Sequence, residues 1–576
     1  MKPKPHIFKG NKNYKSIVIG HIRVLKQNNV TVPKYKINDT QKEIDNLLDA
    51  IKNVKQEVEL LQNKINPEKE KDIYAIFDFY KMYLEDDYYI KDAIDEIKSK
   101  KLNAAYIIEE RHKKTISFFD KIEDIKMRER QEDINFLTQK VLGYLLKNNN
   151  SKSSNFSKKE IIFAKTISPL DLILYHAQGV QAIVTEGGSF TSHTSIIANT
   201  LDISYIMGIN NCLKKVNNND TAIIDGFTGE IFINPDSGLI SQYKIKQKKQ
   251  ENILTELEEE SLSKSFTKDN KYIRIMSNID VIDAPEKINK HNFEGIGLAR
   301  SEFMFHDRER IPSYEEQLTI YKELLLKNKD IEVTIRTFDF SEDKTPNTLK
   351  VFSQHNPSMG LRGIRFSFYQ KIFKIQLKAL IVSAQYGNLK ILFPMISSYE
   401  EFIEIKKIET EILNELDIKK NYKLGIMIET ISSIYILNDI HDEIDFVSLG
   451  TNDLMQYFFA VDRSNSFVNY LSSPFAPSFI RFLNDLTTII KKYDIELSIC
   501  GKIASIPNMI PVLIGINLEI LSVSPLSTPI VKRIIKKISY QKSKELVLKL
   551  INNKTSQQNE ALINEFFKEN NINLGI

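Results

Sequence analysis

The feature that most constrains the fold is a series of eight short apolar runs in the second half of the chain. They begin near Lys271 and read YIRIMSNI, GIGLAR, EVTIRTFDF, KILFPMI, LGIMIE, FVSLGTND, LSICGK and EILSVSP. Most are separated by segments long enough for a crossover helix, which a pair of parallel strands requires. Eight such units over roughly 300 residues predict a (β/α)8 barrel.

Polar side chains stand where several of these apolar runs stop. They are Arg300, Arg336, Glu429, Asn452, Asp453 and Cys500. In a (β/α)8 barrel the carboxyl ends of the strands meet at one face, and the active site lies at that face. The sequence therefore predicts that these side chains gather in one site.

The first half of the chain has a different pattern. From Thr40 the residues TQKE form a capping box, with Thr40 as the cap and Glu43 reaching back to it. Apolar residues then recur at helical spacing, and glycine and proline are almost absent from residues 40–147. These observations predict an all-α unit.

The chain changes character after this helical unit. A polar linker at 148–160 is followed by alternating strands and helices that end near Pro235, and then by a charged helical connector at 241–264. We therefore expect four parts in an α/β multidomain protein. They are an α/β domain made of residues 1–38 and 148–240, a helical subdomain at 39–147, a helical linker at 241–265 and the barrel at 266–576.

The composition excludes several classes of protein. A net charge of +4 on 576 residues gives no dense basic stripe for nucleic acid. The N-terminus lacks the apolar core of a secretion signal, and no run of 18 apolar residues predicts a membrane span. The two cysteines, Cys212 and Cys500, lie far apart in sequence, which favours a reducing compartment over a disulfide framework. We expect a cytoplasmic protein with no direct membrane insertion.

A second candidate site is the segment EGGSFTSHTSIIA at 186–198. A strand-like VTE meets two glycines, which allow a tight turn, and a helix-like stretch starts near Ser192. A histidine at a helix N-terminus, here His193, feels the positive end of the dipole, which favours a neutral imidazole and stabilises a phosphoryl group. Alone, His193 would more often be incidental beside a capping Thr191 or Ser192. The hydroxyl residues around it favour a functional histidine.

Glu429 and Asp453 end two successive predicted strands, so they would lie side by side in a barrel. Two carboxylates with open water positions suit Mg²⁺, which prefers oxygen ligands and a substrate phosphate. The alternative is that both cap loops or pair with arginines. Cys500 ends the seventh run beside a glycine, so we expect a proton donor there, although a lone buried cysteine is usually inert. Cys212 has no such setting and is expected to be structural.

Arginines form a cationic set in the same half of the chain. They are Arg300, Arg336, Arg362, Arg365 and Arg463. Guanidinium groups bind phosphate and carboxylate bidentately, so convergence of several on one rim would predict a phosphate site. A surface ion pair is the alternative for each of them, and we prefer it for Arg365.

These motifs resemble enzyme I of the bacterial phosphotransferase system, the phosphoenolpyruvate-protein phosphotransferase family. GIGLARSEFMF, NPSMGLRGIR, FPMI, GTNDLMQY, VDRSN and SPFAPS occur in the family's order, and the resemblance covers nearly the whole chain. It implies a swivelling phosphohistidine domain with an inserted all-α subdomain that binds the phosphocarrier protein HPr. A C-terminal TIM barrel, through which the family forms homodimers, would follow.

The resemblance also implies a role for each matching residue. His193 matches the histidine that takes the phosphoryl group of phosphoenolpyruvate and passes it to HPr, with release of pyruvate. Cys500 matches the acid that protonates the enolate carbon. The substrate-binding positions are Arg300, Arg336, Asn452, Asp453 and Arg463, and the Mg²⁺ ligands are Glu429 and Asp453. The segment AIFDFYKMYLEDD resembles the HPr-docking helix, and we expect the hinge of the swivel near 241–264.

Several positions depart from the family's pattern. Phe190 stands near the place of an arginine before TSH, and Lys502 replaces an acid after Cys-Gly. Ser341 and Glu342 replace a Gly-Gly pair, and in the docking helix Phe79 and Tyr80 replace smaller or more polar residues. We expect these changes to affect rate and partner affinity more than reaction type.

Two other interpretations stay open. A phosphoenolpyruvate synthase or pyruvate phosphate dikinase shares the histidine domain and the barrel but needs a nucleotide-binding domain, for which the chain offers no room or Gly-rich phosphate loop. A non-catalytic regulatory relative would bind partners through the helical insert. Phe190 and Lys502 favour that relative, whereas the intact His, Glu, Asp, Cys and Arg residues oppose it.

Overall fold

The computed structural model divides into two compact units, between Glu251 and Asn252. It describes residues 6–9, 11–12, 16–25, 32–62, 71–119, 125–146, 160–187, 194, 197–198, 201, 203–281, 292–305, 310–340, 356–369, 372–462, 465 and 467–572. The division falls inside helix α8 (Ser237–Ser261), which is one unbroken helix. The four-part domain division and the hinge expected near 241–264 stay predictions.

Eight parallel strands form a closed barrel in the second unit. They are β10 (Tyr272–Asp280), β11 (Gly295–Arg300), β12 (Glu332–Arg336), β13 (Asn388–Phe393), β14 (Lys423–Ile428), β15 (Phe446–Leu449), β16 (Glu496–Ile499) and β17 (Ile520–Val523). Strand β10 pairs with both β11 and β17, which closes the cylinder, and the short β9 (Ser265–Phe266) adds to β10 antiparallel. Each predicted apolar run overlaps one of these strands, so the predicted barrel is confirmed.

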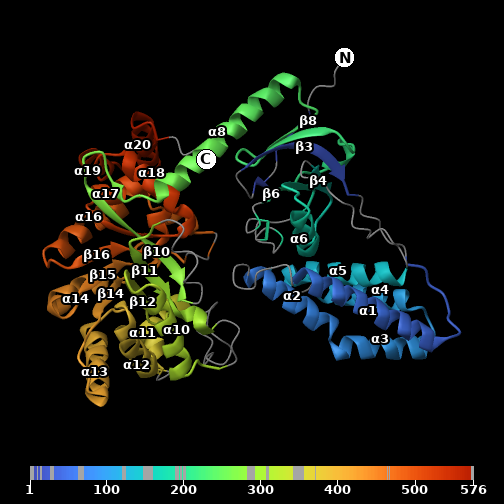
Figure 1. Ribbon diagram of the computed structural model, residues 1–576, viewed down its shortest axis with the longest axis horizontal. Helices are drawn as coiled ribbons and strands as arrows, with labels where there is room; N and C mark the ends of the chain where they lie inside the picture. The colour runs from blue at the N-terminus through green and yellow to red at the C-terminus, as the bar shows by residue number, and fades with distance from the viewer. Residues whose placement is uncertain are drawn as a thin grey trace. The chain divides into compact units, whose positions relative to one another are not determined.

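Helices lie around the barrel strands (Figure 1). They are α10 (Tyr314–Lys327), α11 (Gly363–Tyr369), α12 (Phe373–Ser383), α13 (Tyr399–Leu416), α14 (Ser432–Ile440), α15 (Thr451–Phe459), α16 (Pro477–Lys491), α17 (Ile510–Gly515), α18 (Thr528–Lys537), α19 (Tyr540–Leu550) and α20 (Ser556–Glu569). Alternate strand residues such as Ile391 and Phe393 pack into one large apolar core with these helices. The residues between them face the barrel interior, because side chains alternate along a strand. Leu298, Leu392, Met427, Phe446 and Cys500 form this inner layer.

Five charged side chains form an ion-pair network near the amino ends of the strands. Arg274 lies 2.7 Å from Glu332 and 3.3 Å from Glu496, Lys423 lies 3.0 Å from Glu332, and Lys390 pairs with Glu496. Burial alone would raise the pKa of Glu332, but these cations lower it to about 2. The network therefore stabilises the ionised carboxylate at the end of the barrel opposite to the predicted site.

The first unit contains a mixed sheet in the order β1-β8-β7-β3-β4-β5-β6-β2. Its strands are β1 (His6–Lys9), β2 (Asn11–Lys12), β3 (Ile17–Val24), β4 (Glu160–Ala164), β5 (Ala182–Thr185), β6 (Ser204–Met207), β7 (Thr221–Asp225) and β8 (Glu230–Ile233). Strands β3 to β6 are parallel, and β7 pairs with β3 antiparallel. Helix α6 (Pro169–Ala177) is capped by Ser168, whose side chain accepts a hydrogen bond from the Asp171 amide.

Among the described residues, five helices lie between β3 and β4 in sequence and form a bundle (Figure 1). They are α1 (Thr40–Gln62), α2 (Lys71–Leu84), α3 (Asp87–Lys100), α4 (Ala104–Phe119) and α5 (Ile125–Leu145). The predicted capping box is wrong. Asp39 caps α1 instead, because its Oδ1 accepts from the Lys42 amide at 3.0 Å. The Glu43 carboxylate accepts from the Ala104 amide at 2.8 Å and so caps α4, which ties two helices together.

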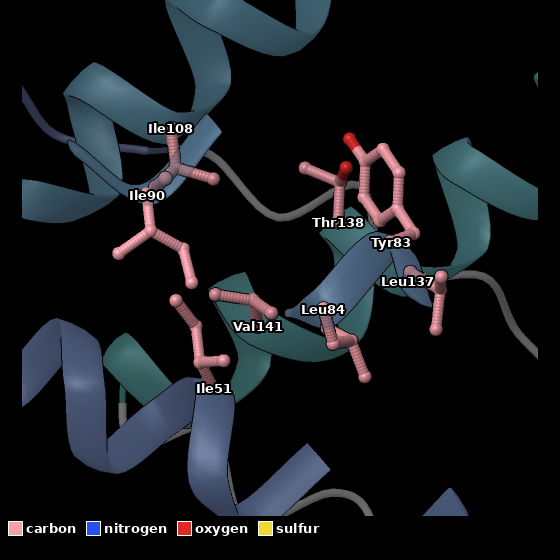
Figure 2. Close-up of a pocket in the computed structure, with 8 residues that line it drawn as sticks. All are labelled: Ile51, Tyr83, Leu84, Ile90, Ile108, Leu137, Thr138 and Val141. Atoms are coloured by element: carbon pink, nitrogen blue, oxygen red, sulfur yellow. The ribbon is translucent and has the colours of Figure 1, made fainter. Parts of the chain in front are cut away.

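The bundle core is closely packed. Figure 2 shows its apolar cavity, lined by Ile51, Tyr83, Leu84, Ile90, Ile108, Leu137, Thr138 and Val141. The cavity measures about 10 Å³, the space of about one water molecule. A core packed in this way leaves no room for a substrate in this cavity. Among the described helices, none combines the length and the apolar character that crossing a membrane requires.

Candidate active site at the carboxyl ends of the barrel strands

Strand register brings the predicted polar residues to one end of the barrel. Arg300 and Arg336 end β11 and β12 and are register partners. Ile428, Leu449 and Ile499 are aligned on β14, β15 and β16, so the residues that follow them begin three neighbouring segments. The first of these segments starts with Glu429 and the third with Cys500, and in the second Gly450 leads directly into α15, whose first turn holds Asn452 and Asp453. The described site residues therefore share one face, as the positions of the strand ends predict.

Buried arginines and carboxylates interlock at this face. Arg336 donates to Glu302 Oε1 at 2.5 Å and lies 3.1 Å from Asp339 Oδ2. Arg362 donates to Asp339 through Nε at 3.1 Å and Nη2 at 2.8 Å. It also donates to Asp453 through Nη1 at 2.8 Å and Nη2 at 3.3 Å. Two acids thus fix the plane of the Arg362 guanidinium group, which is 3% exposed.

A glycine follows Arg362 and makes this placement possible. Gly363 has a φ of 58°, in the left-handed region that other residues rarely adopt. A Cβ at this position would also lie 2.8 Å from the Cβ of Met395. The sequence LRG therefore lets the backbone turn just after the arginine and start α11.

The fully buried Glu429 carboxylate depends on the motif FPMI. Met395 in this motif adopts a φ of 60°, which is costly for a residue with a side chain. In this conformation its amide donates to Glu429 Oε1 at 2.6 Å. Glu429 Oε2 has no hydrogen-bond donor among the described residues. A Cβ on Gly450 would lie only 2.7 Å from Oε2, so the glycine leaves room for this oxygen.

The electrostatics of Glu429 favour a cation beside its carboxylate. Burial raises the pKa of Glu429, and Asp453 and Asp339 raise it further, while Arg336 and Arg362 lower it only in part. In the described part of the site, four carboxyl groups face three guanidinium groups. The acids are Glu302, Asp339, Glu429 and Asp453, and the arginines are Arg300, Arg336 and Arg362.

The donor set fits a hard divalent cation. The open Glu429 Oε2 and the nearby Asp453 carboxylate supply oxygen ligands of the kind that Mg²⁺ prefers. The described residues hold no group of three or more His, Cys, Asp or Glu side chains arranged for a metal. A cation here would therefore complete its shell with water and substrate oxygens, which is the usual arrangement for protein-bound Mg²⁺.

Cys500 provides a protonated thiol beside these charges. Burial raises its pKa to about 11, so the thiol keeps its proton at neutral pH. Its Sγ lies 3.6 Å from the Leu449 carbonyl oxygen, and its side chain packs in the inner layer of the barrel. A buried acid of this kind can deliver a proton to a carbon atom without competition from water.

Asn452, in the first turn of α15, joins this helix to the segment that follows β16. Its Oδ1 accepts from the Lys502 backbone amide at 3.0 Å. Because the backbone of Lys502 makes this contact, the side chain that replaces the family's acid is not needed for it. The Lys502 side chain is exposed.

Comparison with known proteins decides the family. Over 558 residues the chain is 30% identical to the phosphoenolpyruvate-protein phosphotransferase of Bacillus subtilis (strain 168), covering 96% of this chain and 98% of the relative. The chain belongs to the phosphoenolpyruvate-protein phosphotransferase family. The relative of the same name from Buchnera aphidicola subsp. Schizaphis graminum (strain Sg) is 33% identical over 571 residues, covering 96% and 98% of the two chains.

Family models support this membership along the chain. The model of the N-terminal domain of PEP-utilising enzymes matches residues 9–130, that of their mobile domain matches 156–229, and that of their PEP-binding domain matches 255–540. A solution structure of an Enzyme I protein is 25% identical to this chain. The match covers 42% of this chain and 99% of the Enzyme I chain, with a TM-score of 0.38. The resemblance read from the motifs is therefore confirmed, and the chain is an enzyme.

Two predicted site residues, His193 and Arg463, lie outside the described residues, as do Phe190, Ser341 and Glu342. Just after His193, Thr194, Ile197 and Ala198 are helical and buried. Thr194 donates to the Ile167 carbonyl oxygen at 3.4 Å. The predicted helix at this place is therefore present in its described residues.

Three residues of the cluster were missing from the predicted site: Glu302, Asp339 and Arg362. The sequence places Arg362 in the cationic set but does not mark it as a site residue. The sequence feature that could have identified Arg362 is the glycine that follows it. For the two acids it is their position, since Glu302 stands two residues after Arg300 and Asp339 three residues after Arg336. Arg365, predicted to be in a surface ion pair, donates to Glu401 at 2.9 Å and to Ser397 at 2.5 Å, as expected.

Proposed function

We propose that the chain transfers the phosphoryl group of phosphoenolpyruvate to His193 and then to a histidine of HPr, releasing pyruvate. This is the first step of sugar uptake by the phosphotransferase system. One observation carries the proposal: the barrel face combines fixed guanidinium groups, an open buried carboxylate at Glu429 and a protonated thiol at Cys500. Cleavage of an enol phosphate needs all three, because it requires an anion site, charge compensation and a proton for carbon.

Arg300, Arg336 and Arg463 bind the phosphate and carboxylate groups of the substrate in this proposal, together with Asn452. Glu302 and Asp339 support it by holding the Arg336 guanidinium group in place before the substrate arrives. Preorganised charges of this kind stabilise a transition state with little rearrangement. Arg362 is held in the same way and extends the cationic rim.

Glu429 and Asp453 would hold Mg²⁺ in the proposed enzyme. A bound ion would supply positive charge against the excess of carboxylates and the phosphoryl oxygens. Glu429 is fitted for this role because its Oε1 is held by the Met395 amide while Oε2 is open. Asp453 is oriented by Arg362.

Cys500 supplies the proton that makes the reaction complete. The bond between phosphorus and the enol oxygen breaks as phosphorus bonds to a ring nitrogen of His193. The enol oxygen then forms the carbonyl group of pyruvate, and the electron pair of the carbon–carbon double bond takes the thiol proton. Solvent returns a proton to the sulfur, which the raised thiol pKa favours.

We propose that HPr docks on the outer face of α2. Met82 is 64% exposed there, between the exposed acids Asp78, which accepts from Gln62 of α1, and Glu85, which pairs with Lys55 of α1. An apolar contact with acids around it suits a partner that has a basic, partly apolar surface. Tyr80 does not belong to this face, because it is fully buried and its hydroxyl donates to Asp133 at 2.9 Å. The departure at Tyr80 therefore changes the core of the bundle and not the docking surface.

A homodimer and a cytoplasmic location also belong to the proposal, and both rest on membership of the family. The competing idea of a non-catalytic relative is weakened by the intact cluster around Arg362 and Glu429. Its support from Lys502 is also reduced, since the Lys502 contact with Asn452 is made by the backbone.

The test is transfer of labelled phosphate. The full-length protein is incubated with phosphoenolpyruvate labelled on phosphorus, with Mg²⁺ and without nucleotide, and HPr is then added. We expect acid-labile, base-stable label on the protein that moves to HPr. His193→Ala should abolish both, whereas His176→Ala, an exposed histidine in α6 of the same unit, should leave them intact. Undiminished label in His193→Ala, or none in the parent, would refute the proposal.

A further inference from the structure

One buried glutamine outside the site links the ends of β11 and β12. Gln376 lies on α12 and is fully buried. Its Oε1 accepts from the Phe338 amide at 3.0 Å. Its Nε2 donates to Ser301 Oγ at 3.0 Å and to the Tyr321 hydroxyl at 2.9 Å.

The chemistry of the partners fixes which way this amide points. A backbone N–H can only donate, so the Gln376 oxygen must face Phe338. Ser301 Oγ donates to the Arg336 carbonyl oxygen at 2.6 Å, and this leaves the hydroxyl oxygen to accept from Gln376. The side chain thus uses its acceptor and both donor hydrogens on fixed partners.

Two of these three partners, Ser301 and Phe338, adjoin a charged residue of the rim. Ser301 stands between Arg300 and Glu302, and Phe338 precedes Asp339. Ser301 also holds the backbone of Arg336 through its hydrogen bond. The Gln376 side-chain amide therefore holds the backbone just after β11 and just after β12. These two segments carry Glu302 and Asp339, which pair with Arg336.

We propose that Gln376 is a positioning residue for phosphoenolpyruvate, acting through Ser301 and Phe338 to hold the Arg300 and Arg336 ends of the rim. The inference rests on the proposed function. Gln376 touches no substrate atom in this account. It matters because a displacement of about 1 Å at a reacting centre can cost about a hundredfold in rate.

The test compares two buried glutamines. Gln376→Met keeps the length of the side chain and removes its three hydrogen bonds. Gln317→Met is the matched control, because Gln317 is also fully buried and bonds to the Pro312 carbonyl oxygen at 2.9 Å. The measurements are kcat/KM for phosphoenolpyruvate, the rate at which the phosphorylated protein passes its label to HPr, and the Tm.

We expect Gln376→Met to lower kcat/KM for phosphoenolpyruvate about tenfold or more, with transfer to HPr unchanged and a Tm near that of the control. Ser301→Ala should give a smaller loss of the same kind, and the double variant should lose less than the sum, because both changes break one chain of bonds. If Gln376→Met fails to fold, the kcat/KM of Ser301→Ala for phosphoenolpyruvate tests the inference by itself.

Two results would overturn the inference. One is a loss in Gln376→Met no greater than in the control, or, where that variant does not fold, a parent-like kcat/KM in Ser301→Ala. The other is an equal loss in both half-reactions, which marks a general structural role. An unlabelled parent protein would overturn the proposed function itself, whereas a labelled parent with a fully active Gln376→Met removes only the inference.

Discussion

Removing the guanidinium group of Arg362 should destabilise the barrel strongly. This group donates four hydrogen bonds to Asp339 and Asp453 at 2.8–3.3 Å, and both carboxylates are buried. Arg362→Met keeps much of the volume but leaves the acids without this cation. Losing one partner of a buried ion pair costs about 3–5 kcal/mol. Because Arg336 still pairs with Asp339, we expect the free energy of unfolding to fall by about 3 kcal/mol.

The assay is urea unfolding of the full chain, followed by far-ultraviolet circular dichroism because the protein contains no tryptophan. Arg365→Met is the matched control, since Arg365 lies on the same segment but its side chain is 30% exposed. An exposed pair of this kind is worth about 0.2–1 kcal/mol. If Arg362→Met and Arg365→Met lost the same stability, the argument that Arg362 compensates two buried carboxylates would be refuted.

Three more predictions concern Cys500, Glu429 and Glu332. Cys500→Ala should slow pyruvate formation about 10²- to 10⁴-fold with its circular dichroism unchanged, and a parent-like rate would remove Cys500 as the acid. Glu429→Gln should weaken Mn²⁺ binding in calorimetry, and unchanged affinity would exclude Glu429 as a ligand. The pKa of Glu332 is lowered to about 2, so its contribution to stability is full above its unfolded pKa, about 4.3, and disappears as pH falls toward 2. Glu332→Gln should therefore flatten the acid side of the Tm–pH curve, and an unchanged curve would contradict this.

The barrel could be predicted because its strands are buried on both faces. Runs such as KILFPMI and LGIMIE carry apolar residues for the outer core and for the inner layer, so they stand out without a partner sequence. The polar residues at their ends were visible for the same reason. Glu429 and Cys500 follow the last apolar residues of β14 and β16.

The rest of the site depends on contacts between distant residues. Arg362 meets Asp339 across 23 positions and Asp453 across 91 positions, and Arg362 itself lies in none of the apolar runs. The left-handed conformation of Met395 is also invisible in the sequence, since methionine rarely adopts it. Such residues become recognisable only when the barrel brings their loops together.

Local signals misled the prediction in the helical bundle. Thr40 and Glu43 have the spacing of a capping box. In the structure Asp39 accepts from the first turn of α1 instead, and Glu43 accepts from the Ala104 amide at the start of α4. From the sequence, Tyr80 belongs to the changes that we expect to affect rate and partner affinity. Helical periodicity instead places it inward with Phe77 and Leu84, where the phenol finds Asp133.

The most direct test of the central claim measures pyruvate in a single turnover. The full-length protein is mixed with phosphoenolpyruvate and Mg²⁺, without nucleotide and without HPr, and the reaction is quenched at short times. The account predicts a burst of one pyruvate per chain, matched by one phosphoryl group on His193, and no burst from His193→Ala. Pyruvate release from His193→Ala at the parent rate would contradict the account, and so would a parent protein that forms no pyruvate.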